Sequence, residues 1–238
     1  MALPIIETCF SPSMLQLYDL RDRIVVIIDV FRATSTISAA LHHGAKEIIP
    51  VDDVDKCIEL GKQIGNSITA GERNGAVAPG LQHGNSPLEY PREFVEGKSL
   101  VLTTTNGTRL LHMCHNADEI ITGSFLNLGA VCEYLVQQKK PVLLACASWK
   151  DRYNLEDSLF AGAVYDAIGE HFEMNCDSTR AATHLYRLAK LDLYSFIQDS
   201  SHFLRLSAFN LQYDMEYCCQ LNQHNVLIKY EDGRLVIK

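Results

Sequence analysis

The alternation of apolar and polar positions gives its strongest signal close to the start of the chain. Five consecutive β-branched residues, Ile24–Ile28, are typical of a strand that is buried on both faces. Asp29 stands where this strand should end, and hydroxyl-bearing residues precede an apolar run at 37–41. We therefore predict a central strand, a turn, and a helix over 36–43 whose start is capped by hydroxyl groups.

Strand-like and helix-like runs alternate along the following part of the chain, which predicts parallel βαβ units. A long polar loop is expected over 71–92. The remaining predictions are an edge strand within Met1–Ser11, a short helix over 12–19, and strands at 46–51, 68–70, 99–103, 119–122 and 142–145. Helices are predicted at 53–64, after the turn at 104–109 to about 112, at 128–138 and at 154–168.

The C-terminal part is predicted to be helical at 178–189, 194–196 and 215–221. Two apolar runs around Asp232-Gly233 then predict a terminal β-hairpin. The expected fold is a layered α/β/α arrangement with a mostly parallel or mixed sheet, a C-terminal helical segment and the hairpin. We expect one unit over 1–238, with a division into subdomains at about 1–125 and 126–238 left open.

Composition excludes several functional classes. A length of 238 residues, with 47% apolar and 21% charged residues, is enough for a substantial core. A net charge of −8 without a basic run argues against binding to nucleic acid. No apolar run is long enough to cross a membrane, and the N-terminal residues do not resemble a signal peptide. The eight cysteines form no CxxC pair, so we expect reduced thiols and a cytoplasmic protein.

The first candidate site lies at the end of the central strand. Ligands of open α/β sheets bind at the carboxyl ends of the strands, and a helix start attracts anions. Asp29 could hold Mg²⁺ or attack phosphorus, and Arg32 could bind phosphate oxygens beside the hydroxyls of Thr34, Ser35 and Thr36. The alternative is structural: a capping carboxylate and an ordinary salt bridge. The residues alone leave both interpretations open.

A second strand–turn–helix segment repeats this design. Gly107 would let the backbone approach a ligand closely, while Thr105, Asn106 and Thr108 supply polar groups and Arg109 a charge. Ordinary capping of a turn is the alternative.

Two loops and one helix start add further candidates. Glu72 could be a metal ligand or a general base with Arg73 as a phosphate clamp, whereas Asn85 and Ser86 are weak signals. Glu156 and Asp157 open a predicted helix, where carboxylates are favoured for structural reasons, but they also follow another strand end and could complete a Mg²⁺ site or orient water. His202 and Arg205 lie about one helical turn apart, and a lone histidine is more often a packed residue than a catalyst.

Five motifs together resemble the 2-phosphosulfolactate phosphatase family: DVFRATST, GAKEIIPV, GERNG followed by HGNSPLEY, TTTNGTR and NLEDSLFAGA. The similarity runs from about 24 to 169, with weaker matches at 201–205 and 214–216. It implies an α/β fold and a Mg²⁺-dependent phosphatase that releases sulfolactate from 2-phosphosulfolactate, a step toward coenzyme M. Two segments depart from the family pattern: 146–152 and the pair Phe203-Leu204. The first of them gains two basic residues, Lys150 and Arg152.

We therefore predict a phosphomonoesterase acting on a small anionic substrate. A different phosphorylated hydroxy acid as substrate, a non-catalytic metabolite-binding protein, and a homo-oligomer stay open. The predicted catalytic residues are Asp29, Arg32, Glu156 and Asp157; the predicted Mg²⁺ ligands are Asp29, Glu72 and Asp157; and the predicted phosphate-binding residues are Thr34, Ser35, Thr36, Arg73, Asn85, Ser86, Thr105, Asn106, Gly107, Thr108 and Arg109.

Overall fold

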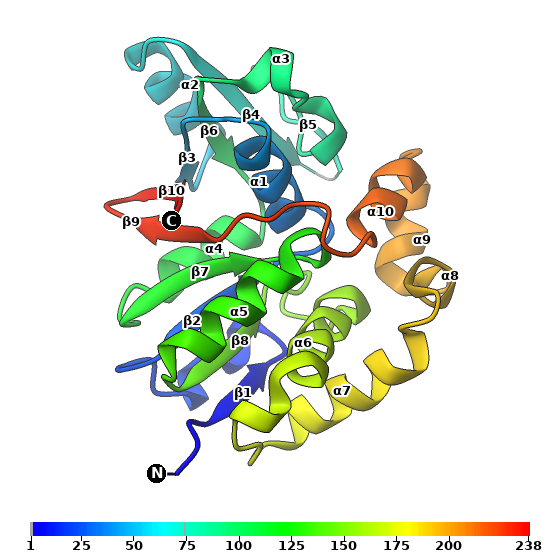
Figure 1. Cartoon of the computed structure of the whole chain (residues 1–238). Helices are drawn as coiled ribbons and strands as arrows, with labels where there is room; N and C mark the ends of the chain where they lie inside the picture. The colour runs from blue at the N-terminus through cyan, green and yellow to red at the C-terminus, as the bar shows by residue number, and fades with distance from the viewer. Residues whose placement is uncertain (1, 74) are drawn as a thin grey trace.

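A computed structural model describes residues 2–73 and 75–238, and within them ten strands form one sheet (Figure 1). The strand order is β1-β8-β2-β7-β9-β10-β3-β6-β4-β5. The strands are β1 (Ile6–Cys9), β2 (Ile24–Ile28), β3 (Glu47–Val51), β4 (Ser67–Arg73), β5 (Ala76–Val77), β6 (Ser99–Thr103), β7 (Glu119–Gly123), β8 (Val142–Cys146), β9 (Ile228–Glu231) and β10 (Arg234–Ile237).

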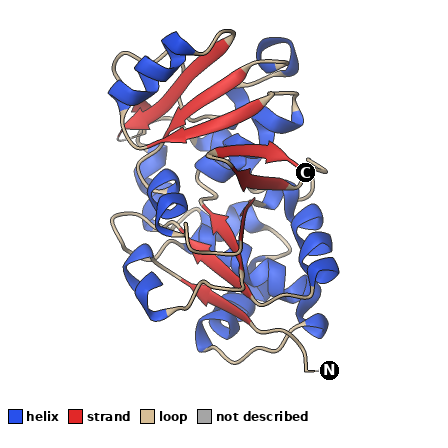
Figure 2. Ribbon diagram, turned by 90° about the vertical axis from the view of Figure 1, so that its left-hand side faces the viewer, coloured by secondary structure: helices blue, strands red, loops and turns tan. Residues whose placement is uncertain are grey.

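The sheet consists of two parallel halves joined by the C-terminal hairpin. Strands β1, β8, β2 and β7 are parallel to one another, as are β3, β6 and β4. The antiparallel hairpin β9–β10 lies between β7 and β3. It pairs with β7 at two positions and with β3 at one, and Figure 2 shows the two sets of strands turned relative to each other.

Alternate residues of β2 enter two different cores. Ile24, Val26 and Ile28 pack in a core with residues of α5 (Leu128–Gln138), α6 (Leu155–Ile168) and α7 (Asp177–Ala189). Val25 and Ile27 pack in a second core with residues of α1 (Ala33–His42) and α4 (Gly107–Met113). The strand is thus buried on both faces, which confirms the predicted layered α/β/α arrangement with a mostly parallel sheet.

The predicted C-terminal helical segment and the terminal hairpin are also confirmed. The other helices are α2 (Val54–Gln63), α3 (Arg92–Val95), α8 (Leu193–Ile197), α9 (Ser201–Ser207) and α10 (Gln212–Cys218), with 3₁₀ turns at Pro12–Leu17, Pro87–Glu89, Phe125–Asn127 and Gly169–His171. Among the described residues, no helix has the length and apolar character that crossing a membrane requires.

Three local predictions need correction, and one helix was not predicted. Helix α1 begins at Ala33, so the hydroxyl residues lie inside its first turn and do not cap it. Strand β4 continues to Arg73, because its last residues pair with β5, and the predicted loop therefore starts later. Helix α3 was not predicted. The edge strand predicted within Met1–Ser11 is the shorter β1, and Met1 lies outside the described residues.

The division into subdomains near residue 125 stays a prediction. The parallel ladder of β2 with β8 joins strands from both sides of that position.

Candidate active site

The carboxyl ends of strands from both halves of the sheet meet at one polar cavity. Asp29 follows β2, Glu72 lies at the end of β4, and Thr105 follows β6. The other lining residues come from the turn before α1, the turn between β4 and β5, the loop before Pro87–Glu89, the turn between β6 and α4, the segment after β8, and α9. They are Phe31, Arg32, Gly75, Asn85, Thr104, Asn106, Trp149, Lys150, His202, Arg205 and Leu206.

Asp29 lies in a closely packed environment at the base of α1. Its backbone N–H donates to Thr34 Oγ1 (3.2 Å), and the Thr34 N–H donates to the Asp29 carbonyl (2.9 Å). A Cβ atom on Gly107 would lie 2.9 Å from Asp29 Oδ2, so the absence of a side chain at 107 makes room for the carboxylate. Burial raises the pKa of Asp29 to about 6; His202 opposes this shift, and the nearby Glu72 carboxylate adds to it.

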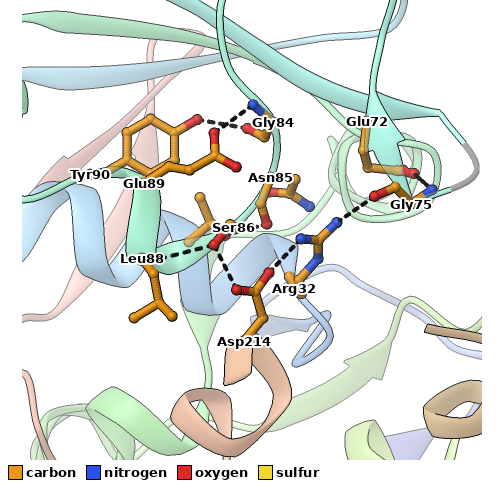
Figure 3. Close-up of polar contacts among 11 residues, drawn as sticks. Arg32, Glu72, Gly75, Gly84, Asn85, Ser86, Leu88, Glu89, Tyr90 and Asp214 are labelled. Carbon is orange, nitrogen blue, oxygen red and sulfur yellow. Dashed lines mark hydrogen bonds and ion pairs between the residues drawn. The ribbon is translucent and has the colours of Figure 1, made fainter. Parts of the chain in front are cut away.

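Arg32 is held in the cavity wall by a buried ion pair with Asp214 of α10 (Figure 3). Arg32 Nη1 lies 2.6 Å from Asp214 Oδ2, and Nη2 donates to the Gly75 carbonyl (3.3 Å). Ser86 Oγ donates to the other oxygen of Asp214 (2.7 Å). The predicted phosphate ligand Ser86 thus supports the partner of Arg32 instead of lining the cavity.

Glu72 joins the end of β4 to the turn after β6. Its Oε1 accepts hydrogen bonds from the N–H (3.2 Å) and the hydroxyl (2.8 Å) of Thr105, and its Oε2 accepts one from the Gly75 N–H (3.0 Å). Figure 3 shows the bond to Gly75 beside Arg32. Both oxygens of Glu72 therefore already have donors.

The adjacent carboxylates at the start of α6 have different environments. Glu156 is fully buried, and its Oε1 pairs with Nδ1 of His202, a residue of α9 that lines the cavity. Asn154 Nδ2 also lies 3.2 Å from this nitrogen. Asp157 accepts backbone hydrogen bonds from Val30 (2.9 Å) and Ser148 (3.2 Å), and burial raises its pKa well above its usual value. Asp157 thus braces two loops, whereas Glu156 holds a histidine toward the cavity.

The hydroxyl groups predicted to bind phosphate make bonds within the protein. Ser35 Oγ donates to the Val30 carbonyl (2.9 Å), and Thr36 Oγ1 donates to the Asn85 carbonyl (2.9 Å). Thr108 bonds to Thr104. These hydroxyls support the turns around the cavity and do not line it.

Two predicted phosphate clamps lie outside the cavity as well. Arg73 donates to the Glu72 carbonyl (2.7 Å) and to Thr103 Oγ1 (3.2 Å). Arg109 forms a half-exposed salt bridge with Asp151 (3.2 Å). Of the sequence candidates, the structure brings Asp29, Arg32, Glu72, Asn85, Thr105 and Asn106 together at the cavity, with Glu156 behind His202.

The cavity has a cationic side that the pattern of strand ends does not reveal. Lys150 Nζ lies 4.7 Å and Arg205 Cζ 4.5 Å from the centre of the Trp149 ring, and all three side chains line the cavity. The one-turn spacing of His202 and Arg205 was the available signal for α9. Lys150 stood out as a basic residue gained in this segment, while Arg152 does not line the cavity.

Several oxygens could accept a cation. Asn85 Oδ1 and Glu156 Oε2 are buried and have no hydrogen-bond partner among the described residues. Together with Asp29 they offer the oxygen ligands that Mg²⁺ prefers. Asp29, Glu72 and Asp157 do not form a tight carboxylate cluster, because no three acidic side chains of residues 2–73 and 75–238 bring ligand oxygens within 4.8 Å of one another.

A layered α/β fold that brings a buried carboxylate and several basic side chains into one cavity beside its strand ends is typical of an enzyme that acts on a small anion. Residues 9–233 match the family model described as 2-phosphosulpholactate phosphatase. Proteins named "Probable 2-phosphosulfolactate phosphatase" are similar over nearly the whole length. The one from Caldanaerobacter subterraneus subsp. tengcongensis is 37% identical over 218 residues, 90% of each chain. The one from Thermotoga maritima is 38% identical over 216 residues, 91% of this chain and 92% of the relative. The one from Clostridium perfringens is 32% identical over 235 residues, 97% and 95%.

The chain therefore belongs to the 2-phosphosulfolactate phosphatase family, whose members are phosphoric monoester hydrolases. The family resemblance predicted from the sequence motifs is confirmed.

Proposed function

We propose that this enzyme hydrolyses 2-phosphosulfolactate, or a closely related small 2-phospho-hydroxy acid, to the hydroxy acid and phosphate with the help of Mg²⁺. The observation that carries the proposal is the meeting of Asp29 with Arg32, Lys150 and Arg205 in one cavity. Three cationic side chains suit a substrate that carries both a phosphate and further acidic groups. The names of the relatives support the same substrate class.

The proposed cation ligands are Asp29 and the amide oxygen of Asn85. Mg²⁺ is commonly held by one or two carboxylates, substrate oxygens and water, so a three-carboxylate cage is not needed. The buried amide oxygen without a donor fits this kind of site. When bound, the ion would neutralise charge on the phosphoryl group.

Three of the lining residues have defined roles in this proposal. Arg32 is fixed by Asp214 and Gly75, so it can donate to phosphate oxygens without first being ordered. Water adds to phosphorus as the bond to the ester oxygen breaks, and the leaving alkoxide takes a proton. His202, whose Nδ1 is paired with Glu156, is placed to supply that proton from its other ring nitrogen. Asp29 acts as a cation ligand in this step. In the alternative step Asp29 attacks phosphorus, the bond to the ester oxygen breaks, and water then hydrolyses the resulting acyl phosphate to restore Asp29 and release phosphate.

The test is phosphate release from 2-phosphosulfolactate and from a panel of 2-phospho-hydroxy acids, with Mg²⁺ or with EDTA. We expect turnover that requires Mg²⁺ and falls at least about 100-fold in Asp29→Asn. Asp118→Asn, which changes an exposed carboxylate paired with Lys140, is the matched control and should keep full activity. Equal turnover with EDTA would contradict the role of the ion, and full activity of Asp29→Asn would contradict the assignment of the site.

A further inference from the structure

Three histidines meet outside the catalytic cavity. His42 and His43 stand at the end of α1, and His224 lies in the segment between α10 and β9, which passes α1 in Figure 1. One ring nitrogen of each lies within 4.8 Å of the other two. Their ring centres are 4.5 Å (His42 and His224), 5.3 Å (His42 and His43) and 6.0 Å (His43 and His224) apart. In the part of the chain that the structure describes, no other three His, Cys, Asp or Glu side chains come this close.

In two of these rings, Nδ1 lies within hydrogen-bond distance of a protein oxygen. His43 Nδ1 lies 2.7 Å from the Tyr90 carbonyl, which can only accept, so Nδ1 carries the proton and Nε2 keeps its lone pair. His224 Nδ1 lies 2.9 Å from the buried Ser38 hydroxyl. Metal-binding histidines typically hold their second nitrogen on a protein oxygen in this way, which sets the tautomer and the ring orientation.

The third ring differs from the other two. His42 is half-buried, and its side chain has no hydrogen bond to the described residues. It stacks on His224 with an angle of 19° between the planes, so a rotation of His42 is needed to direct a lone pair inward. His224 Nε2 lies 3.0 Å from the hydroxyl of Tyr217, a half-buried residue that can exchange this contact for water.

We propose that His42, His43 and His224 form a second metal site, for a transition-metal ion of the Zn²⁺ type. Imidazole nitrogens suit such ions and are poor ligands for Mg²⁺, so this site and the catalytic cavity select different metals. Three histidines leave a fourth position of a tetrahedral ion to water. A bound ion would fasten the end of α1 to the segment that leads into the C-terminal hairpin.

The experiment is titration of metal-free protein with Zn²⁺, in excess Mg²⁺, followed by calorimetry and thermal melting. His42→Gln is the test variant, because this side chain can be replaced without breaking a hydrogen bond. His184→Gln, at an exposed position of α7, is the matched control. We expect one Zn²⁺ equivalent and a raised Tm in the wild type and the control. In His42→Gln we expect the affinity for Zn²⁺ to be at least roughly tenfold weaker. Even the loss of a residue that only hydrogen-bonds to a metal ligand weakens metal binding by this factor.

A second readout separates this site from the catalytic cavity. His202→Gln should bind Zn²⁺ with the same affinity as the wild type, and His42→Gln should keep the wild-type phosphatase activity in Mg²⁺. Two results would overturn the proposal: Zn²⁺ binding that is unchanged in His42→Gln, or no binding by the wild-type protein at micromolar Zn²⁺.

Discussion

Replacing Asp214 by Asn removes the charge that holds Arg32 while keeping the shape of the side chain. In the native structure Asp214 accepts from the guanidinium at 2.6 Å and from Ser86 Oγ at 2.7 Å. Arg32 and Asp214 are 5% and 6% exposed, so bulk water is a poor replacement for the lost charge. The variant leaves a buried guanidinium without a countercharge: its acceptors are then neutral, the amide oxygen at position 214 and the Gly75 carbonyl at 3.3 Å.

The expected loss of stability is large because one charge of a buried pair is left alone. Breaking such a pair costs about 3–5 kcal/mol. For a protein of this size, each kcal/mol lowers the Tm by about 2–4 °C, so Asp214→Asn should melt roughly 6–20 °C below the wild type. The exposed pair of Asp118 and Lys140 gives the matched control, and Asp118→Asn should lose no more than about 1 kcal/mol.

The assay is thermal melting of the three proteins, together with phosphatase kinetics well below the lowest Tm. Because Arg32 lines the cavity, Asp214→Asn should also lower kcat/KM while the protein is folded. Equal melting temperatures for Asp214→Asn and Asp118→Asn would refute the reasoning, since they would show that Arg32 does not depend on its buried partner. A lower Tm with unchanged kcat/KM would show that the contribution of Arg32 to the reaction does not depend on Asp214.

Two further predictions concern close packing and thiol chemistry. Gly107→Ala brings a methyl group within 2.9 Å of Asp29 Oδ2, so phosphatase activity should fall. The control Gly65→Ala, whose methyl group meets nothing within 4 Å, should keep full activity. Equal activities of the two variants would show that the carboxylate can move aside. Burial raises the pKa of Cys57 to about 11, and six of the other cysteines are buried as well. Cys176 is half-buried; its burial is outweighed by hydrogen bonds, first of all with Thr179, which lower its pKa. A thiol reagent at pH 8 should therefore label Cys176 of the native protein first and all eight cysteines after unfolding; rapid native labelling of several thiols would contradict this.

Local patterns predicted the strands of this fold well. The apolar run at 24–28 is buried on both faces because helices cover each side, and Asp232-Gly233 turns the hairpin as its residue types require. What local patterns could not predict is the place of that hairpin within the sheet, since its pairing partners lie more than a hundred residues away.

The site shows the same limit. Asp29 and Glu72 were found because they follow strands, and strand ends share a position in such folds. The hydroxyls of 34–36 were predicted to face a ligand, but α1 begins at Ala33 and its first turn directs them to backbone groups. Ser35 and Thr36 donate to carbonyls, and Thr34 accepts from the Asp29 N–H. His202 and Arg205 reach the cavity because α9 packs there through Phe203 and Leu206, which only the tertiary structure reveals.

The hairpin that joins the two halves of the sheet also has a consequence for folding. Strands β3, β4 and β6 come from one continuous stretch of the chain. In the other half, β1 and β2 pair with β8, more than a hundred residues away, and the hairpin must find Thr122 on one side and Ile48 on the other across stretches of similar length. The cavity takes Asp29 from one half and Glu72 from the other, so it exists only after both halves are joined. Recovery of enzymatic activity during refolding should therefore require this joining of the two halves, and lag behind the recovery of helix and strand content.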